Sequence, residues 1–116
     1  MSDFIQVTTT VEKREDADRI ARTVVERRLA ACAQVLGPVT STYRWKGKIE
    51  TAGEWMVVMK TRETLYAELE RAIREMHPYE VPEIVATRIE TGSRDYLEWL
   101  RAETAKDAED AKKDNS

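Results

Sequence analysis

The sequence predicts an α+β domain in which two βαβ halves are joined by a β-hairpin. Three observations lead to this prediction. Hydrophobic patterns follow one another in the order strand, helix, strand, strand, helix, strand. Lys46, Gly47 and Lys48 separate the two middle strands, and glycine accepts the positive φ of a tight hairpin turn. The length of 116 residues is that of one domain.

The first half of the chain begins with a strand over residues 4–11, which is rich in β-branched and aromatic side chains. Residues 15–31 are predicted to be helical, because their apolar side chains recur at the spacing of one buried helical face. A long strand over residues 33–45 follows, interrupted by Gly37 and Pro38. The apolar helical positions are Ala17, Ile20, Ala21, Val24, Val25 and Leu29.

The second half begins with the return strand over about residues 49–60, which lies centrally in the sheet because its end is apolar on both faces. A second helix opens at Thr61 and ends at His77, since Pro78 disfavours helical geometry in the residue before it. Residues 83–90 form the fourth strand, and a short third helix follows. The apolar faces are Leu65, Leu69, Ala72, Ile73 and Met76 in the second helix, and Tyr96, Leu97, Trp99 and Leu100 in the third.

This order of elements predicts a ferredoxin-like (split βαβ) sandwich, with two helices on one face of a four-stranded antiparallel sheet. We expect the domain to cover residues 1–102. No large apolar residue follows Ala102, so residues 103–116 are predicted to be a polar C-terminal tail that is frayed or disordered.

The hairpin strands are long for a domain of this size. Residues 33–45 would extend over roughly 40 Å at about 3.3 Å per residue, whereas the whole domain is only about 34 Å across. The hairpin must therefore bend near Gly37, project beyond its own sheet, or do both. A projecting hairpin exposes Tyr43, Trp45 and Ile49, which a second subunit would cover, so we expect an oligomer. The alternative is an arm that folds back on its own domain.

Composition and motifs argue against several classes of protein. The net charge of −3 argues against bulk nucleic-acid binding, and no stretch reaches the roughly 18 apolar residues of a membrane span. The start of the chain lacks the apolar run of a secretory signal, and the single cysteine agrees with a reducing compartment, so a cytoplasmic location is expected. The common phosphate-loop and hydrolase motifs are missing, and only a Cys32–His77 nucleophilic pair is left open.

Several strings of the sequence match a known family in order. Residues 43–50 read Tyr-Arg-Trp-Lys-Gly-Lys-Ile-Glu, and residues 77–83 read His-Pro-Tyr-Glu-Val-Pro-Glu. Over residues 4–101 the chain resembles the CutA family of divalent-cation tolerance proteins. The shorter strings of the match are Leu29–Cys32, Lys60–Thr61 and Asp95–Leu100.

The resemblance implies a ferredoxin-like fold, a homotrimer held by strand pairing between subunits, and a cytoplasmic location in bacteria. It also implies a role in tolerance of copper and other divalent metals, with metal binding proposed for some members, and no enzymatic activity. Such trimers are similar to the PII signalling proteins. Binding of a small anionic metabolite in the subunit clefts is therefore the alternative function, and a purely structural scaffold is the third.

His77, the only histidine, is the first candidate metal ligand. Imidazole suits copper(II), and the carboxylates of Glu54 and Glu80 or the thiol of Cys32 could complete a site, in part with groups of a second subunit. In the opposing interpretation, His77 only orders its loop and Cys32 is a small apolar filler. No cofactor is firmly expected, and the candidate ligand is copper or another divalent cation.

Two positions weaken the copper hypothesis. Some relatives carry a further thiol late in the first strand and a second histidine beside His77, whereas this chain has Thr9 and Met76 there. Any copper binding is therefore expected to be weak. A ligand cleft or subunit interface is predicted at Tyr43, Trp45, Lys46, Lys60 and Tyr79.

Overall fold

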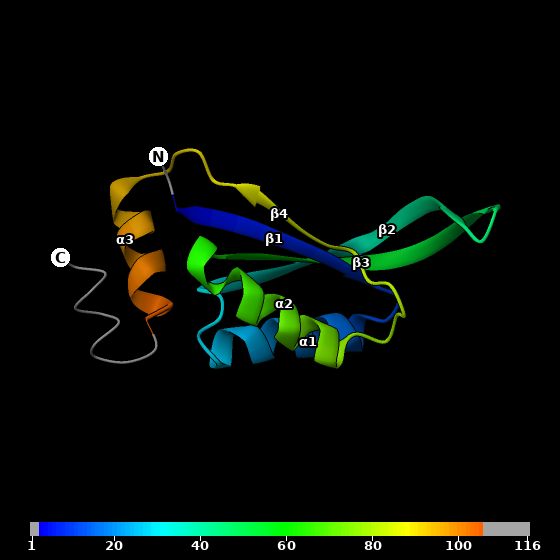
Figure 1. Ribbon diagram of the computed structural model, residues 1–116, viewed down its shortest axis with the longest axis horizontal. Helices are drawn as coiled ribbons and strands as arrows, with labels where there is room; N and C mark the ends of the chain where they lie inside the picture. Colours follow the sequence, from blue (N-terminus) through cyan, green and yellow to red (C-terminus); the bar gives the residue numbers. More distant parts are fainter. Residues whose placement is uncertain (1–2, 106–116) are drawn as a thin grey trace.

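The computed structural model describes residues 3–105, and this part of the chain forms one sheet and three α-helices. The strands are β1 (Phe4–Val11), β2 (Cys32–Trp45), β3 (Lys48–Arg62) and β4 (Ile84–Arg88). The helices are α1 (Arg14–Glu26), α2 (Tyr66–Met76) and α3 (Arg94–Glu103), and a 3₁₀ turn (Glu63–Leu65) precedes α2. The sheet is antiparallel in the order β2-β3-β1-β4, and α1 and α2 lie on one face of it (Figure 1). The predicted ferredoxin-like fold is confirmed.

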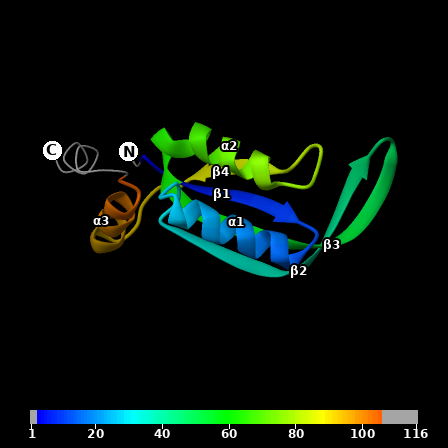
Figure 2. The ribbon, with the colours of Figure 1, turned by 90° about the horizontal axis from the view of Figure 1, so that it is seen from below.

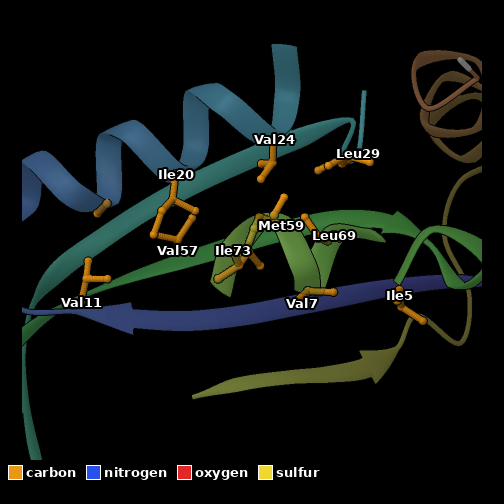
Figure 3. Close-up of a cluster of buried hydrophobic side chains, with 13 residues drawn as sticks. Ile5, Val7, Val11, Ile20, Val24, Leu29, Val57, Met59, Leu69 and Ile73 are labelled. Atoms are coloured by element: carbon orange, nitrogen blue, oxygen red, sulfur yellow. The ribbon is translucent and has the colours of Figure 1, made fainter. Parts of the chain in front are cut away.

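The main core lies between the sheet and these two helices. Side chains alternate between the faces of a strand, so Val7 of β1 and its neighbour Met59 of β3 both point toward the helices. In Figure 3, Ile20 and Val24 of α1 and Ile73 of α2 pack on this layer side by side, since both helices lie on the same face of the sheet. All five side chains are fully buried.

The prediction for the end of the first helix is wrong by five residues. It was expected at residue 31, but α1 ends at Glu26, because Arg28 adopts a left-handed backbone with φ 59°. The Arg28 N–H donates to the Val25 carbonyl at 3.0 Å, and the Leu29 N–H donates to the Val24 carbonyl at 2.9 Å. This is a Schellman cap, for which glycine is the usual sequence signal. Leu29 is nevertheless buried, as its hydrophobic spacing predicted.

The β2–β3 hairpin both bends and projects. Its register shifts between Leu36 and Val39, where β2 carries one extra residue in a bulge, and beyond this point the hairpin leaves the sheet (Figures 1 and 2). The molecule is consequently 51 Å long but only 25 and 22 Å across. Lys46 and Gly47 form the predicted turn with positive φ values of 50° and 81°. Ile49 near its tip is exposed, as expected for a projecting arm.

The sheet face opposite α1 and α2, which we call the open face, carries apolar side chains with little cover. Met56 and Val58 of β3 point to it, because their neighbours in the strand face the core. Leu36 lies opposite Met56 on β2, and Val85 of β4 lies beside Thr8 of β1. Leu36 and Val85 are about half exposed. The open face is therefore a continuous surface that a single chain leaves in water.

Helix α3 covers one end of the sheet, where Leu100 packs against Phe4 and Ala31. The buried residues Thr104 and Ala105 follow it, so the folded part continues past the predicted boundary at residue 102. The rest of the predicted tail, residues 106–116, lies outside the described residues. Within residues 3–105, no helix has the length and apolar character needed to cross a membrane.

Candidate functional site

A pocket of about 570 Å³, which we call the hairpin pocket, lies between the β2–β3 hairpin and the loop that joins α2 to β4. The end of β1 provides Thr10, and the loop provides Tyr79 and two carboxylates. The hairpin strands provide aromatic and acidic side chains, because the bulge turns β2 toward the loop at this point. The side chains used below are Thr10, Tyr43, Trp45, Glu54, Tyr79 and Glu80.

Glu54 is the central charged group of the pocket. Its residue is only 6% exposed, and the Tyr79 hydroxyl donates a hydrogen bond of 2.7 Å to its Oε2 atom. Burial raises the pKa of Tyr79, and the bond to Glu54 and its charge raise it further, so the phenol keeps its proton. Within residues 3–105 no cationic side chain pairs with this carboxylate. A nearly buried anion therefore faces the pocket with a neutral hydrogen-bond donor as its partner.

His77 fastens the loop to the end of β1. Its Nε2 atom lies 2.8 Å from the Thr10 carbonyl oxygen, and its Nδ1 atom accepts a hydrogen bond of 3.1 Å from the Tyr79 N–H. A carbonyl only accepts and a backbone N–H only donates, so Nε2 carries the proton and the ring is neutral. Both nitrogens are thus in use, and a metal at His77 would have to displace one of these bonds.

The stability of the protein is expected to fall in acid through His77. Burial lowers its pKa from the usual 6.5, although the bond to Thr10 and the nearby charges of Asp16 and Glu54 partly oppose this. The unfolded chain therefore binds a proton at this histidine more readily than the folded protein does. The contribution of neutral His77 to the stability of the fold is complete above about pH 6.5 and is lost as the pH falls through the pKa of the folded state.

Urea unfolding of wild type and His77→Gln at pH 7.5 and 5.5 measures this effect. At pH 7.5 the free energy of unfolding of the wild type is expected to exceed that of His77→Gln by about 1–3 kcal/mol. The difference between the two proteins should be smaller at pH 5.5. NMR titration of the single histidine reports its pKa directly. A pKa of His77 above 6.5, or a difference in stability between the two proteins that is the same at both pH values, would contradict a neutral His77 that links the loop to β1.

The structure brings together only part of the predicted metal set. Glu54 and Glu80 line the pocket, with His77 behind it, but Cys32 lies at the other end of β2, where its Sγ atom is 3.5 Å from the Tyr96 hydroxyl. Within residues 3–105 there is no group of three or more histidine, cysteine, aspartate or glutamate side chains that could hold a metal ion. Tyr43, Trp45 and Tyr79, which were predicted to form a ligand cleft or a subunit interface, line the pocket, and that role stays a prediction.

The remaining predicted residues have other contacts. The Lys46 ammonium lies 5.6 Å from the centre of the Trp45 ring, and Lys60 donates a hydrogen bond of 2.8 Å to Gln34 away from the pocket. The nucleophilic pair left open above is not formed. In the sheet, Cys32 lies opposite Lys60 of β3, whereas Thr10, to which His77 is bonded, lies opposite Met56 of β3. Lys60 and Met56 are four residues apart on β3, which corresponds to about 13 Å along the strand.

Five residues that line the pocket were missed by sequence reasoning: Thr10, Ser41, Thr42, Val81 and Glu83. Thr10 and Ser41 sit in strand patterns that carry no functional signal, and Glu83 appeared only as the last residue of a family string. The pocket depends on how far the bulge turns the hairpin toward the loop, which strand periodicity does not reveal.

The fold and the pocket define a class of protein: a ferredoxin-like domain with a projecting hairpin and an acidic, aromatic pocket at the base of that hairpin. Residues 5–103 match the family model described as CutA1 divalent ion tolerance protein. The chain belongs to this family.

Known relatives agree with this assignment. The chain is 44% identical over 95 residues to Protein CutA of Homo sapiens, which is 82% of this chain but 53% of the human protein, so it spans about half of that relative. It is 43% identical over 98 residues to the divalent-cation tolerance protein CutA of Thermus thermophilus, covering 84% of this chain and 95% of that protein. The crystal structure of CutA1 from Oryza sativa superimposes with a TM-score of 0.87 at 36% identity and covers 91% of this chain and 97% of that one.

Proposed function

We propose that this chain forms a homotrimer that acts in divalent-cation tolerance by binding a metal ion weakly in the hairpin pocket, without catalysis. The observation that carries the proposal is the Glu54 carboxylate, which is nearly buried, faces the pocket and has no cationic partner among the described residues. A bound cation would supply the missing positive charge. Membership of a family of divalent ion tolerance proteins supports the same role.

The surfaces that one chain leaves uncovered support the proposed self-association. The open face presents Leu36, Met56, Val58 and Val85, and the hairpin extends beyond its own sheet with strand edges that can pair with another copy. A trimer would bury both surfaces. It would also place groups of a second subunit near the pocket, which is the way a site with few ligands in one chain could be completed.

The chemistry of the pocket sets the expected affinity. Glu54 and Glu80 supply oxygen ligands, which copper(II), manganese(II) and zinc(II) all accept, but both nitrogens of His77 are engaged and Cys32 is distant. Water or a second subunit must fill the remaining coordination positions. We therefore expect weak binding with little selectivity. A cytoplasmic location is part of the same proposal and is consistent with a single cysteine.

The alternative of an anionic metabolite finds less support in the pocket. Three carboxylates, those of Glu54, Glu80 and Glu83, line it, and no lysine or arginine does so among the described residues. An anion would meet repulsion there, whereas PII-like anion recognition needs basic side chains or free backbone N–H groups.

Isothermal titration calorimetry with copper(II), at known oligomeric state, tests the metal role. Glu54→Gln keeps an oxygen that can accept the Tyr79 hydrogen bond but removes the charge, and we expect it to weaken binding at least tenfold. The matched control is Glu90→Gln, an exposed glutamate after β4, which should bind as the wild type does. Equal binding by Glu54→Gln and wild type would refute the pocket as the metal site. If His77→Ala loses copper(II) binding and Glu54→Gln does not, the metal ligand would be the imidazole of His77 and not the carboxylate of Glu54.

A further inference from the structure

We propose that the hairpin pocket is also a binding site for an aliphatic diamine or short polyamine, held by carboxylates at its ammonium groups and by aromatic rings along its length. This goes beyond metal tolerance. It uses the pocket of the proposed function but does not depend on metal binding.

The carboxylates of the pocket provide the charge. Glu54 is nearly buried, and its Oε2 atom takes the Tyr79 hydrogen bond, while no contact within the described residues occupies its Oε1 atom. Glu80 and Glu83 lie at the loop side of the same pocket. An alkylammonium group carries several N–H donors, and it can donate to a carboxylate while the hydroxyls of Thr10 and Ser41 accept others. A ligand with two ammonium groups could pair with two of these carboxylates at once.

The aromatic walls provide the second part of the recognition. Tyr43 and Trp45 lie two residues apart on β2, and Tyr79 lies in the loop that joins α2 to β4, and all three line this pocket. The face of an aromatic ring attracts ammonium groups, and tryptophan does so most strongly. The protein already uses this attraction, since the ammonium of Lys46 lies 5.6 Å from the centre of the Trp45 ring. Methylene groups of an aliphatic chain would pack on the same rings.

The size of the pocket leaves room for an organic cation as well as for a bare ion. A volume of about 570 Å³ is in the usual range for small organic ligands. Within residues 3–105 the three carboxylates that line the pocket do not form one cluster of metal ligands, so a metal held by Glu54 and Glu80 needs further ligands from water or a second subunit. A diamine could pair one ammonium group with Glu54 of β3 and the other with a carboxylate of the loop that joins α2 to β4.

Calorimetry with 1,4-diaminobutane in buffer containing a metal chelator tests the proposal. We expect binding of the diamine, and none of 1,4-butanediol, which has the same carbon chain without the charges. Glu54→Gln should weaken diamine binding at least tenfold. Trp45→Leu should weaken it about 3- to 30-fold, and Trp45→Tyr should restore much of the loss because it keeps an aromatic face.

The matched control is Trp99→Leu. Trp99 lies on α3 and is 42% exposed, compared with 40% for Trp45, so it controls for the loss of a half-exposed indole. Light scattering verifies that each variant keeps the wild-type mass. The proposal is overturned if the diamine does not bind at millimolar concentration, if butanediol binds equally, or if both tryptophan variants bind alike. Diamine failure with retained copper(II) binding would leave the proposed function standing, and the reverse result would refute the metal role alone.

Discussion

The Leu36→Asp variant is expected to exist as single chains in solution, whereas the wild type is expected to have about three times the single-chain mass of 13.4 kDa. Leu36 lies on the open face and is 48% exposed in one chain, so an isolated subunit would tolerate aspartate there. In a trimer that buries the open face, the same carboxylate would be taken out of water without a partner, at a cost of several kcal/mol. Multi-angle light scattering at micromolar concentration measures the mass.

A control for this prediction lies on the other side of the molecule. Val25 of α1 was predicted on the buried face of the helix, but it is 39% exposed, close to the value for Leu36, and it belongs to the helical layer. Val25→Asp should therefore keep the wild-type mass. A wild type that is a single chain, or a Leu36→Asp variant that keeps the mass of the wild type, would show that the open face is not the interface and would remove the argument for a shared site.

Replacing Arg62 with alanine is expected to lower the free energy of unfolding by about 2–4 kcal/mol. Arg62 is a buried residue at the end of β3, and its guanidinium donates two hydrogen bonds of 2.9 Å to Thr104, one to Oγ1 and one to the backbone carbonyl. Without it, a buried carbonyl loses its donor and α3 loses a link to the sheet. Urea unfolding at one fixed chain concentration measures the change, because association itself adds stability.

Two comparisons make this prediction specific. Thr104→Val removes the hydroxyl but keeps the carbonyl as an acceptor, so its cost should be smaller than that of Arg62→Ala. Arg71→Ala changes an exposed arginine of α2 and should alter stability by less than about 0.5 kcal/mol. Hydrogen exchange should show faster opening of α3 in Arg62→Ala than in the wild type. Unchanged protection of α3 would mean that Arg62 does not hold this helix.

Hydrophobic periodicity predicted the elements of this fold well where they were long and regular. The strand over residues 4–11 agrees with β1, and the proline after His77 marks the end of α2 as expected. Prediction failed where long-range or unusual backbone geometry decided the outcome. Arg28 caps α1 without the glycine that normally signals such an end, and Thr104 is buried because a distant arginine reaches it.

The candidate site was predicted by residue type and only partly by position. Glu54, Tyr43, Trp45 and Tyr79 were identified and do meet in one pocket, whereas Cys32 was grouped with them and lies at the far end of its strand. A family string can identify residues that matter, but it does not give the distances between them. The two backbone bonds of His77 were likewise outside the reach of the sequence, since a list of candidate ligands does not show which nitrogen is free.

By itself, the sequence determined the order of strands and helices, the buried faces of α1 and α2 and the excess length of the hairpin, because these depend on local spacing and on chain length. Only the tertiary structure decided where the hairpin bends, that Glu54 faces the pocket without a cationic partner among the described residues, and that Cys32 is excluded from it. The physical reason is that a bulge and a loop placed 40 residues apart must pack together before their side chains share one space.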